Sequence, residues 1–110
     1  MLIFGMVESG RGESFIEAAG LLKALASPVR LAVVVELGDG PRCVHELLEV
    51  FHGDGREVSQ PLLSQHLKVL RRAGLVTTTR QATEIRYQLV DDHVGSIVRD
   101  AIRHAEEEKP

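Results

Sequence analysis

The chain has 110 residues, of which 44 % are hydrophobic and 26 % charged, a composition typical of one globular domain. The longest aliphatic run, residues 31–35, is too short to cross a bilayer, and the apolar first five residues lack the charged leader of a signal peptide. Because a single cysteine excludes an internal disulfide and fits a reducing compartment, we expect a cytoplasmic protein.

The formal net charge of −3 is unevenly distributed along the chain. Residues 59–90 contain five basic side chains and one acidic side chain, whereas the segments on both sides are acidic. A local basic region attracts phosphate even when the whole chain is acidic. The charge pattern is therefore compatible with nucleic acid binding.

The beginning of the chain divides into a tail and a first helix. Residues 1–13 are rich in glycine and charge and have no apolar period, so we expect a flexible tail before a single domain over residues 14–108. From Glu13 to Ala26, apolar residues recur at three- and four-residue spacing, which predicts a helix. Its apolar face is broad enough to need a second cover, and a partner subunit is the simplest one.

A second helix is predicted from strong start and stop signals. Ser27 and Pro28 are a typical N-cap and first helical residue. The helix that they begin extends to about Leu37, where the breaker cluster at residues 38–41 stops it.

Two further helices follow on either side of a polar loop. The helical period restarts over residues 44–51, and residues 52–58 form the loop. Ser59 is the N-cap of the next helix, and Gly74 is its expected left-handed terminator. The predicted buried stripe of this helix consists of Leu62, Leu63, Leu67 and Leu70.

The apolar period then changes from helical to two. Residues 75–80 and 84–89 alternate and are rich in β-branched side chains, and the polar residues 81–83 lie between them, which predicts a β-hairpin. The helical period returns after Val90. The chain is thus predicted to be mainly α-helical with a β-hairpin wing (α+β), the winged helix-turn-helix arrangement, in which the helix over residues 59–73 enters the major groove of DNA.

The polar side of that helix and the hairpin supply the candidate DNA contacts. Serine and glutamine suit the edges of bases, and lysine and arginine suit phosphates or the minor groove. Whether His66 contacts DNA is left open, because this residue lies close to the core side of the helix. For any one of these side chains, ordinary solvent exposure is the alternative. The candidate DNA-binding residues are Gln60, Ser64, Gln65, Lys68, Arg71, Arg72, Arg80 and Arg86.

Four stretches of the sequence carry a family resemblance. Residues 26–31, 43–47, 58–70 and 73–76 include the core Ser-x-His-Leu-x-x-Leu from Ser64 to Leu70, which is followed by a glycine stop and a hairpin. Over roughly residues 14–107 the chain resembles the ArsR/SmtB family of metal-sensing repressors. The resemblance implies a homodimer, joined through its first and last helices, that binds a near-palindromic operator when metal-free. The loop at 52–58 is longer than the family's tight turn.

The last helix contains four residue types that bind zinc: Asp91, His93, His104 and Glu107. Asp91 and His104 lie about 20 Å apart along a helix, so the two ends of one helix cannot hold the same ion. Two antiparallel copies of the helix bring the ends together, and two-fold symmetry then makes two sites per dimer. The four residues also match the interhelical zinc site of the family's zinc sensors. The alternative is that Asp91 is only an N-cap and the others are solvated.

Zinc is preferred over nickel or cobalt, because an octahedral ion needs further imidazoles and neither end of the chain supplies one. Cys43 and His45 are a possible secondary sensing site, since the resemblance places a metal or thiol site at the start of the third helix. A second cysteine is missing there, so a structural role of the Cys43 thiol is favoured.

The predicted function is a transcriptional repressor that binds its operator as a metal-free homodimer and is released by zinc. One alternative is a repressor of the same fold that responds to a non-metal signal, such as oxidation of Cys43. A metal-dependent hydrolase is disfavoured, because a catalytic zinc needs an open coordination position and a substrate cleft. We therefore do not expect an enzyme.

Overall fold

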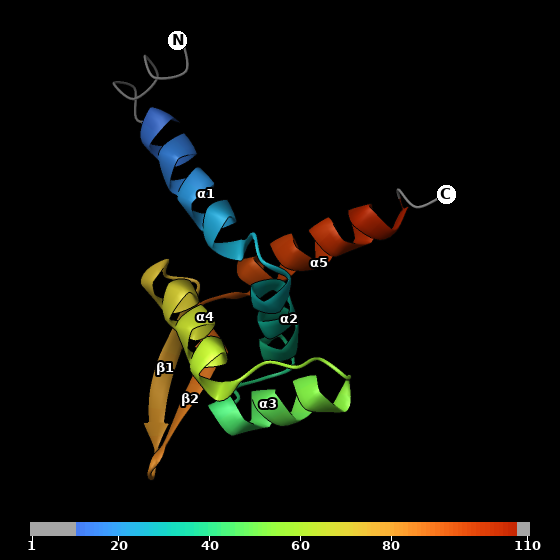
Figure 1. The fold of residues 1–110 in the computed structure, drawn as a ribbon. Helices are drawn as coiled ribbons and strands as arrows, with labels where there is room; N and C mark the ends of the chain where they lie inside the picture. The colour runs from blue at the N-terminus through green and yellow to red at the C-terminus, as the bar shows by residue number, and fades with distance from the viewer. Residues whose placement is uncertain (1–10, 108–110) are drawn as a thin grey trace.

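The computed structural model describes residues 11–107, so most of the expected N-terminal tail and the end of the expected domain, residue 108, lie outside the described residues. Figure 1 shows the order of the elements along this part of the chain. They are α1 (Arg11–Leu25), α2 (Pro28–Leu37), α3 (Val44–Gly53), α4 (Gln60–Arg72), β1 (Val76–Gln81), β2 (Glu84–Leu89) and α5 (Asp92–Glu107).

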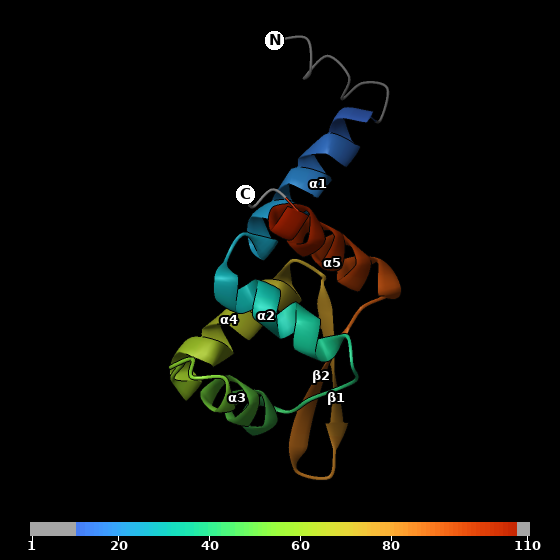
Figure 2. The same ribbon diagram turned by 90° about the vertical axis from the view of Figure 1, so that its right-hand side faces the viewer.

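The core lies around the central helix α2, where α3, α4, α5 and the hairpin come together (Figures 1 and 2). α2 packs against α4 on one side and against α5 and β2 elsewhere, and α3 packs against α4. The side chains with the least exposure are Val33, Val34, Leu47, Phe51, Leu63, Leu67, Leu70, Leu75, Val76 and Val98. This is the predicted mainly helical fold with a hairpin wing.

Side-chain caps and prolines begin α2 and α4 as predicted. The Ser27 hydroxyl accepts a hydrogen bond from the Arg30 backbone N–H at 3.3 Å, and the Ser59 hydroxyl accepts one from the Leu62 N–H at 3.2 Å. Each helix has a proline in its first turn, where no intrahelical N–H bond is lost. The start of each helix is therefore encoded locally.

Gly74 follows the end of α4 with φ +75°, the left-handed conformation predicted for this terminator. We expect Gly74→Ala to lower the free energy of unfolding by about 1 kcal/mol, because an added Cβ strains this conformation. A Cβ at Gly74 meets no atom within 4 Å, so the loss is one of backbone conformation alone. Gly53→Ala is the matched control, since that glycine is equally open but has no positive φ. Urea denaturation at fixed protein concentration measures both; equal effects of the two substitutions would contradict this reading of Gly74.

β1 and β2 form a two-stranded antiparallel sheet in which Val76 pairs with Leu89 and Gln81 pairs with Glu84. The predicted tip, residues 81–83, is one residue too long, because Gln81 is still paired. The turn is Ala82 and Thr83, and Ala82 has φ 56°. A bridge between Arg42 and Tyr87 attaches β2 to the segment before α3, with N···O distances of 3.0 and 2.8 Å.

Three boundaries or faces differ from the sequence-based expectation. α1 begins at Arg11 rather than Glu13. The backbone N–H groups of the first turn have no partner within a helix, so the glycine in this turn does not prevent the helix from starting there. α3 extends to Gly53, and His52 Nε2 lies 3.1 Å from the Val58 carbonyl oxygen, a contact that holds the loop against the helix. Leu62 is 43 % exposed, so the buried stripe of α4 consists of the other three leucines.

The first and last helices extend away from the core in different directions (Figure 1). Residues 13–20 of α1 are exposed, and α1 reaches the core near its end, through Leu21, Ala24 and Leu25. Large apolar side chains on these two helices remain in contact with solvent: Phe15, Ile16, Leu22 and Ile97.

Within residues 11–107, no helix taken singly has the length and apolar character to cross a membrane, and only α1 and α2 together, bent by 94°, satisfy that criterion as a pair.

Candidate functional site

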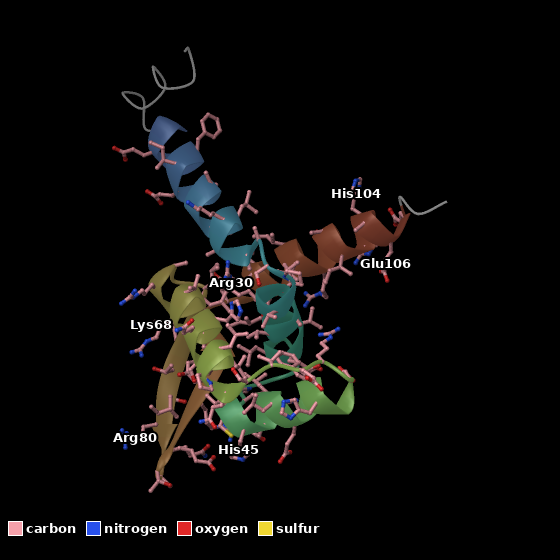
Figure 3. All side chains as sticks on the ribbon, in the orientation of Figure 1. Arg30, His45, Lys68, Arg80, His104 and Glu106 are labelled. Carbon is pink, nitrogen blue, oxygen red and sulfur yellow. The ribbon has the colours of Figure 1, made fainter. Side chains whose placement is uncertain are left out.

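One face of the molecule presents the polar side of α4 together with the hairpin. Leu63, Leu67 and Leu70 direct the opposite side of α4 into the core. In Figure 3, Lys68 from α4 and Arg80 from β1 extend to the same side of the molecule, away from α5. The candidate DNA contacts with exposed side chains are Gln60, Ser64, Gln65, Lys68, Arg71, Arg72 and Arg80.

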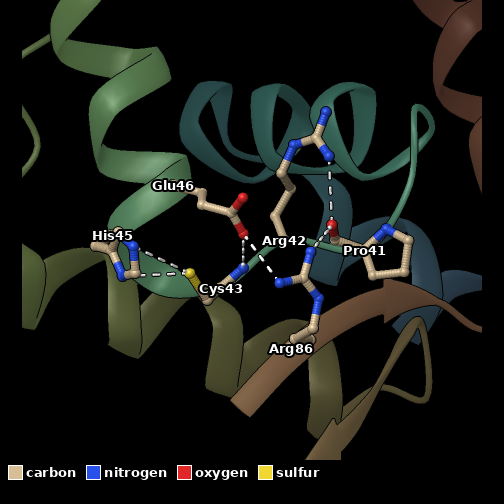
Figure 4. Close-up of polar contacts among 6 residues, drawn as sticks. All are labelled: Pro41, Arg42, Cys43, His45, Glu46 and Arg86. Carbon is tan, nitrogen blue, oxygen red and sulfur yellow. Dashed lines mark hydrogen bonds and ion pairs between the residues drawn. The ribbon is translucent and has the colours of Figure 1, made fainter. Parts of the chain in front are cut away.

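Arg86 differs from the other candidate DNA contacts because it has partners within the protein. Its Nη2 donates to the Pro41 carbonyl oxygen at 3.0 Å, and its Nη1 lies 3.5 Å from a Glu46 carboxylate oxygen (Figure 4). The side chain is 26 % exposed. Any contact of Arg86 with DNA therefore competes with these two partners.

His66, whose role as a DNA contact was undecided from the sequence, lies on the inner flank of α4 and is partly buried. Its Nδ1 lies 3.0 Å from Nη1 of Arg30, which belongs to α2. The sequence pattern does not identify Arg30, because its partner is 36 residues away along the chain.

Asp91 and His93 lie together at the start of α5. Asp91 Oδ1 accepts hydrogen bonds from the backbone N–H groups of His93 at 2.9 Å and Val94 at 3.2 Å, so Asp91 is the N-cap of the helix. Its other oxygen, Oδ2, lies 3.8 Å from His93 Nδ1, and the His93 side chain is 90 % exposed. Neighbouring ligands of one tetrahedral zinc ion lie about 3 to 4 Å apart. The cap thus leaves one carboxylate oxygen beside an imidazole at a spacing suited to zinc.

His104 and Glu107 lie in the last turn of α5 and are exposed. About 20 Å of helix separates Asp91 from His104, and the structure of one chain does not bring the two pairs together. The carboxylate and imidazole donors at both ends are chemically suited to zinc, but neither end of the helix alone supplies four ligands.

Cys43 lies at the start of α3 and is 4 % exposed. Its backbone N–H donates to Glu46 Oε1 at 2.9 Å, and its Sγ lies 3.2 Å from His45 Nδ1 (Figure 4). Burial raises the pKa of the Cys43 thiol, and the carboxylates of Glu46 and Glu84 raise it further. The hydrogen bond from the Cys43 N–H lowers the pKa of Glu46. A raised pKa disfavours the thiolate, the form that oxidants attack.

Ligand atoms of Cys43, His45 and Glu84 lie within 4.8 Å of one another, and among residues 11–107 this is the one set of three or more potential metal ligands so close together. Sequence reasoning missed Glu84, which lies on β2, because only the packing of the hairpin beside α3 brings it there. The spacing of Cys43 and His45, two residues apart, is the one feature of the sequence that points to this group of potential metal ligands.

The helices α2 to α4 followed by the antiparallel hairpin define a winged helix-turn-helix protein. Residues 27–78 match the family model "Bacterial regulatory protein, arsR family". Over 94 residues the chain is 51 % identical to the HTH-type transcriptional repressor SmtB of Mycobacterium tuberculosis. The matched region covers 84 % of this chain and 66 % of that repressor. The chain thus spans slightly less than two thirds of the length of this relative.

A second curated relative is the HTH-type transcriptional regulator NmtR of Mycobacterium tuberculosis, 40 % identical over 82 % of this chain and 71 % of its own length. The solved structure of the transcriptional repressor BigR from Xylella fastidiosa is similar with a TM-score of 0.70 and 35 % identity, covering 84 % of this chain and 90 % of that one. The chain belongs to the arsR family of bacterial regulatory proteins. The named relatives are transcriptional regulators, in agreement with the expectation that this chain is not an enzyme.

Proposed function

We propose that the protein is a transcriptional repressor that binds operator DNA as a homodimer and is released when zinc binds between two copies of α5. The observation that supports DNA binding most strongly is the single exposed face on which α4 and the hairpin present their polar and basic side chains. In a winged helix-turn-helix protein, α4 occupies the major groove and the hairpin lies beside the duplex.

The division of roles follows from chemistry. Gln60, Ser64 and Gln65 present donor and acceptor groups suited to base edges. The basic side chains hold phosphates or enter the minor groove, and they are Lys68, Arg71, Arg72, Arg80 and Arg86.

Arg80→Ala tests this proposal. We expect weaker binding to every duplex, specific or not, and a salt dependence of log K that is shallower by about 1, because one phosphate contact is lost. Arg103→Ala is the matched control, since Arg103 is exposed on α5 and forms an ion pair with Asp100 on the same helix. Fluorescence anisotropy over a series of salt concentrations measures both. An unchanged slope for Arg80→Ala removes the hairpin from the proposed interface.

The homodimer is proposed to form through α1 and α5. Apolar side chains on both helices are exposed in the single chain, and burying them against a second copy removes apolar area from water. An antiparallel pair of α5 helices also places Asp91 and His93 beside His104 and Glu107 of the partner subunit. Both the apolar surface and the ligand spacing therefore favour the same contact.

The four α5 residues are proposed to hold zinc, which when bound joins the two helices through imidazole and carboxylate ligands. Asp91 contributes Oδ2, since Oδ1 caps the helix. Metal binding stabilises the dimer arrangement that brings these ligands together. If that arrangement positions the two α4 helices poorly for the operator, bound zinc weakens DNA binding and bound DNA weakens zinc binding by the same coupling free energy, about 1–3 kcal/mol.

A second candidate is a metal response through Cys43, His45 and Glu84, favoured by the closeness of their ligand atoms. It is preferred to oxidation of Cys43, because a metal ion would use the imidazole of His45 and the carboxylate of Glu84 beside the thiol. The raised pKa of the thiol disfavours the thiolate, which both oxidants and metal ions require. We expect Cys43→Ser to retain release by zinc if the α5 site is the sensor. Loss of the response in Cys43→Ser, with a normal response in His104→Ala, would select this second candidate; the measurement is the zinc titration of the protein–DNA complex described below.

A further inference from the structure

The side chain of Arg30 connects three helices. It begins on the first turn of α2, where its backbone N–H donates to the capping hydroxyl of Ser27. Its Nε donates to the carbonyl oxygen of Ala24, near the end of α1, at 2.5 Å. Its Nη1 lies 3.0 Å from Nδ1 of His66 on α4. In Figure 3, Arg30 lies where these helices meet.

The chemistry of the pair fixes the protonation state of His66. A guanidinium group has donors and no acceptor, so the hydrogen bond requires His66 Nδ1 to accept and the imidazole proton to lie on Nε2. Burial lowers the pKa of His66, and the positive charge of Arg30 lowers it further. Among the residues that the structure describes, Arg30 is the one charged group with a resolved effect on this pKa. The neutral imidazole is therefore the form that the fold favours at neutral pH.

His66 lies between the two sides of α4. Leu63 and Leu67 are buried in the core, and Gln65 and Ser64 belong to the exposed face. Apolar packing is non-directional and permits a helix to rotate slightly, whereas a hydrogen bond has a preferred direction. The bond to Arg30 thus restrains the rotation of α4 about its own axis.

We propose that Arg30 and His66 are positioning residues, which hold the exposed face of α4 in one orientation relative to the end of α1. This inference rests on the proposed DNA binding. It adds a connection between α1, whose exposed part is the proposed dimer contact, and the residues proposed to read bases. A shift of α1 reaches α4 through Arg30, since the same guanidinium group contacts both helices.

A double-mutant cycle tests the connection. The variants are Arg30→Met, His66→Leu and the double variant, and the probe is a labelled duplex selected from random sequences by the wild-type protein. We expect each single variant to bind this duplex about 10-fold more weakly, as expected for loss of a hydrogen bond to a charged group, and the double variant to lose little more. Binding to a scrambled duplex stays within about twofold. Effects that multiply in the double variant would overturn the proposal, as would single variants that bind like the wild type.

His66→Asn guards against a purely structural explanation. The side-chain oxygen of asparagine can accept a hydrogen bond near the position of the imidazole Nδ1, so this variant is expected to bind the selected duplex within about twofold of the wild type. Failure of His66→Asn to restore the binding lost in His66→Leu, with circular dichroism showing a folded protein, would contradict the positioning role.

The pH dependence of DNA affinity distinguishes the Arg30–His66 pair from the other titratable groups of the protein. Because burial and Arg30 lower the pKa of His66 from its ordinary value of 6.5, the wild type is expected to lose affinity for the selected duplex more steeply than His66→Asn only as the pH falls below 6.5. Protonation there removes the acceptor and places two positive charges together. His45, His52, His93 and His104 are present in both proteins, so the difference isolates His66. Identical profiles would overturn the proposal. If the wild-type protein selects no duplex at all, the proposed function itself fails.

Discussion

His104→Ala is expected to bind the selected operator duplex within about twofold of the wild-type affinity and to remain bound when zinc is added. The substitution removes one of four proposed ligands at the end of α5, a region distant from the exposed face of α4 (Figure 3). The wild-type complex is expected to weaken by about 5- to 150-fold at saturating zinc, the range of a coupling of 1–3 kcal/mol. Anisotropy titrations of the protein–DNA complex with zinc measure this release.

Glu106→Ala is the matched control for this prediction, because Glu106 is exposed in the same turn of α5 and lies outside the proposed ligand set. It should be released by zinc like the wild type. A His104→Ala protein that leaves DNA at the same zinc concentration as the wild type shows that sensing occurs elsewhere. The group of Cys43, His45 and Glu84 is then the next place to examine.

Gln65→Ala is expected to weaken binding to the selected duplex by about 1–3 kcal/mol, roughly 5- to 150-fold, and to leave binding to a scrambled duplex unchanged. Gln65 is exposed on the side of α4 opposite the buried leucines, and its amide can pair with the edge of a base. The loss is therefore confined to the specific site. Equal losses on both duplexes make Gln65 a backbone contact, and no loss on either one means that α4 enters the groove with a different face.

The helix starts and stops were predictable because their signals are local. Ser27, Ser59 and Gly74 act on backbone groups within a few residues, and the structure confirms all three. The prediction that Leu62 is buried is wrong, because a position next to the buried stripe does not by itself reveal whether another element covers the side chain. Hydrophobicity alone does not separate the edge of a stripe from its centre.

The candidate site was predictable to different extents. The polar face of α4 follows from helical periodicity, and the structure leaves its residues exposed as expected. The contact between Arg30 and His66, and the approach of Glu84 to Cys43, depend on packing between segments far apart in the chain. No local pattern encodes such contacts. The sharing of α5 ligands between subunits follows from spacing and remains a prediction.

The central claim is that each zinc site combines the start of one α5 with the end of another, and a mixing experiment tests it most directly. One protein carries Asp91→Ala and His93→Ala, and the other carries His104→Ala and Glu107→Ala. Each homodimer lacks half of both proposed sites. A heterodimer regains one complete site, because the intact start of one helix meets the intact end of the other.

The measurement is a zinc titration of the two proteins separately and after exchange of subunits, with calorimetry as the readout. We predict weak zinc binding by each protein alone and, after mixing, a tight site at one zinc ion per heterodimer. Tight binding by either protein alone, or a mixture that binds no more tightly than its components, would contradict a site shared between the two α5 helices.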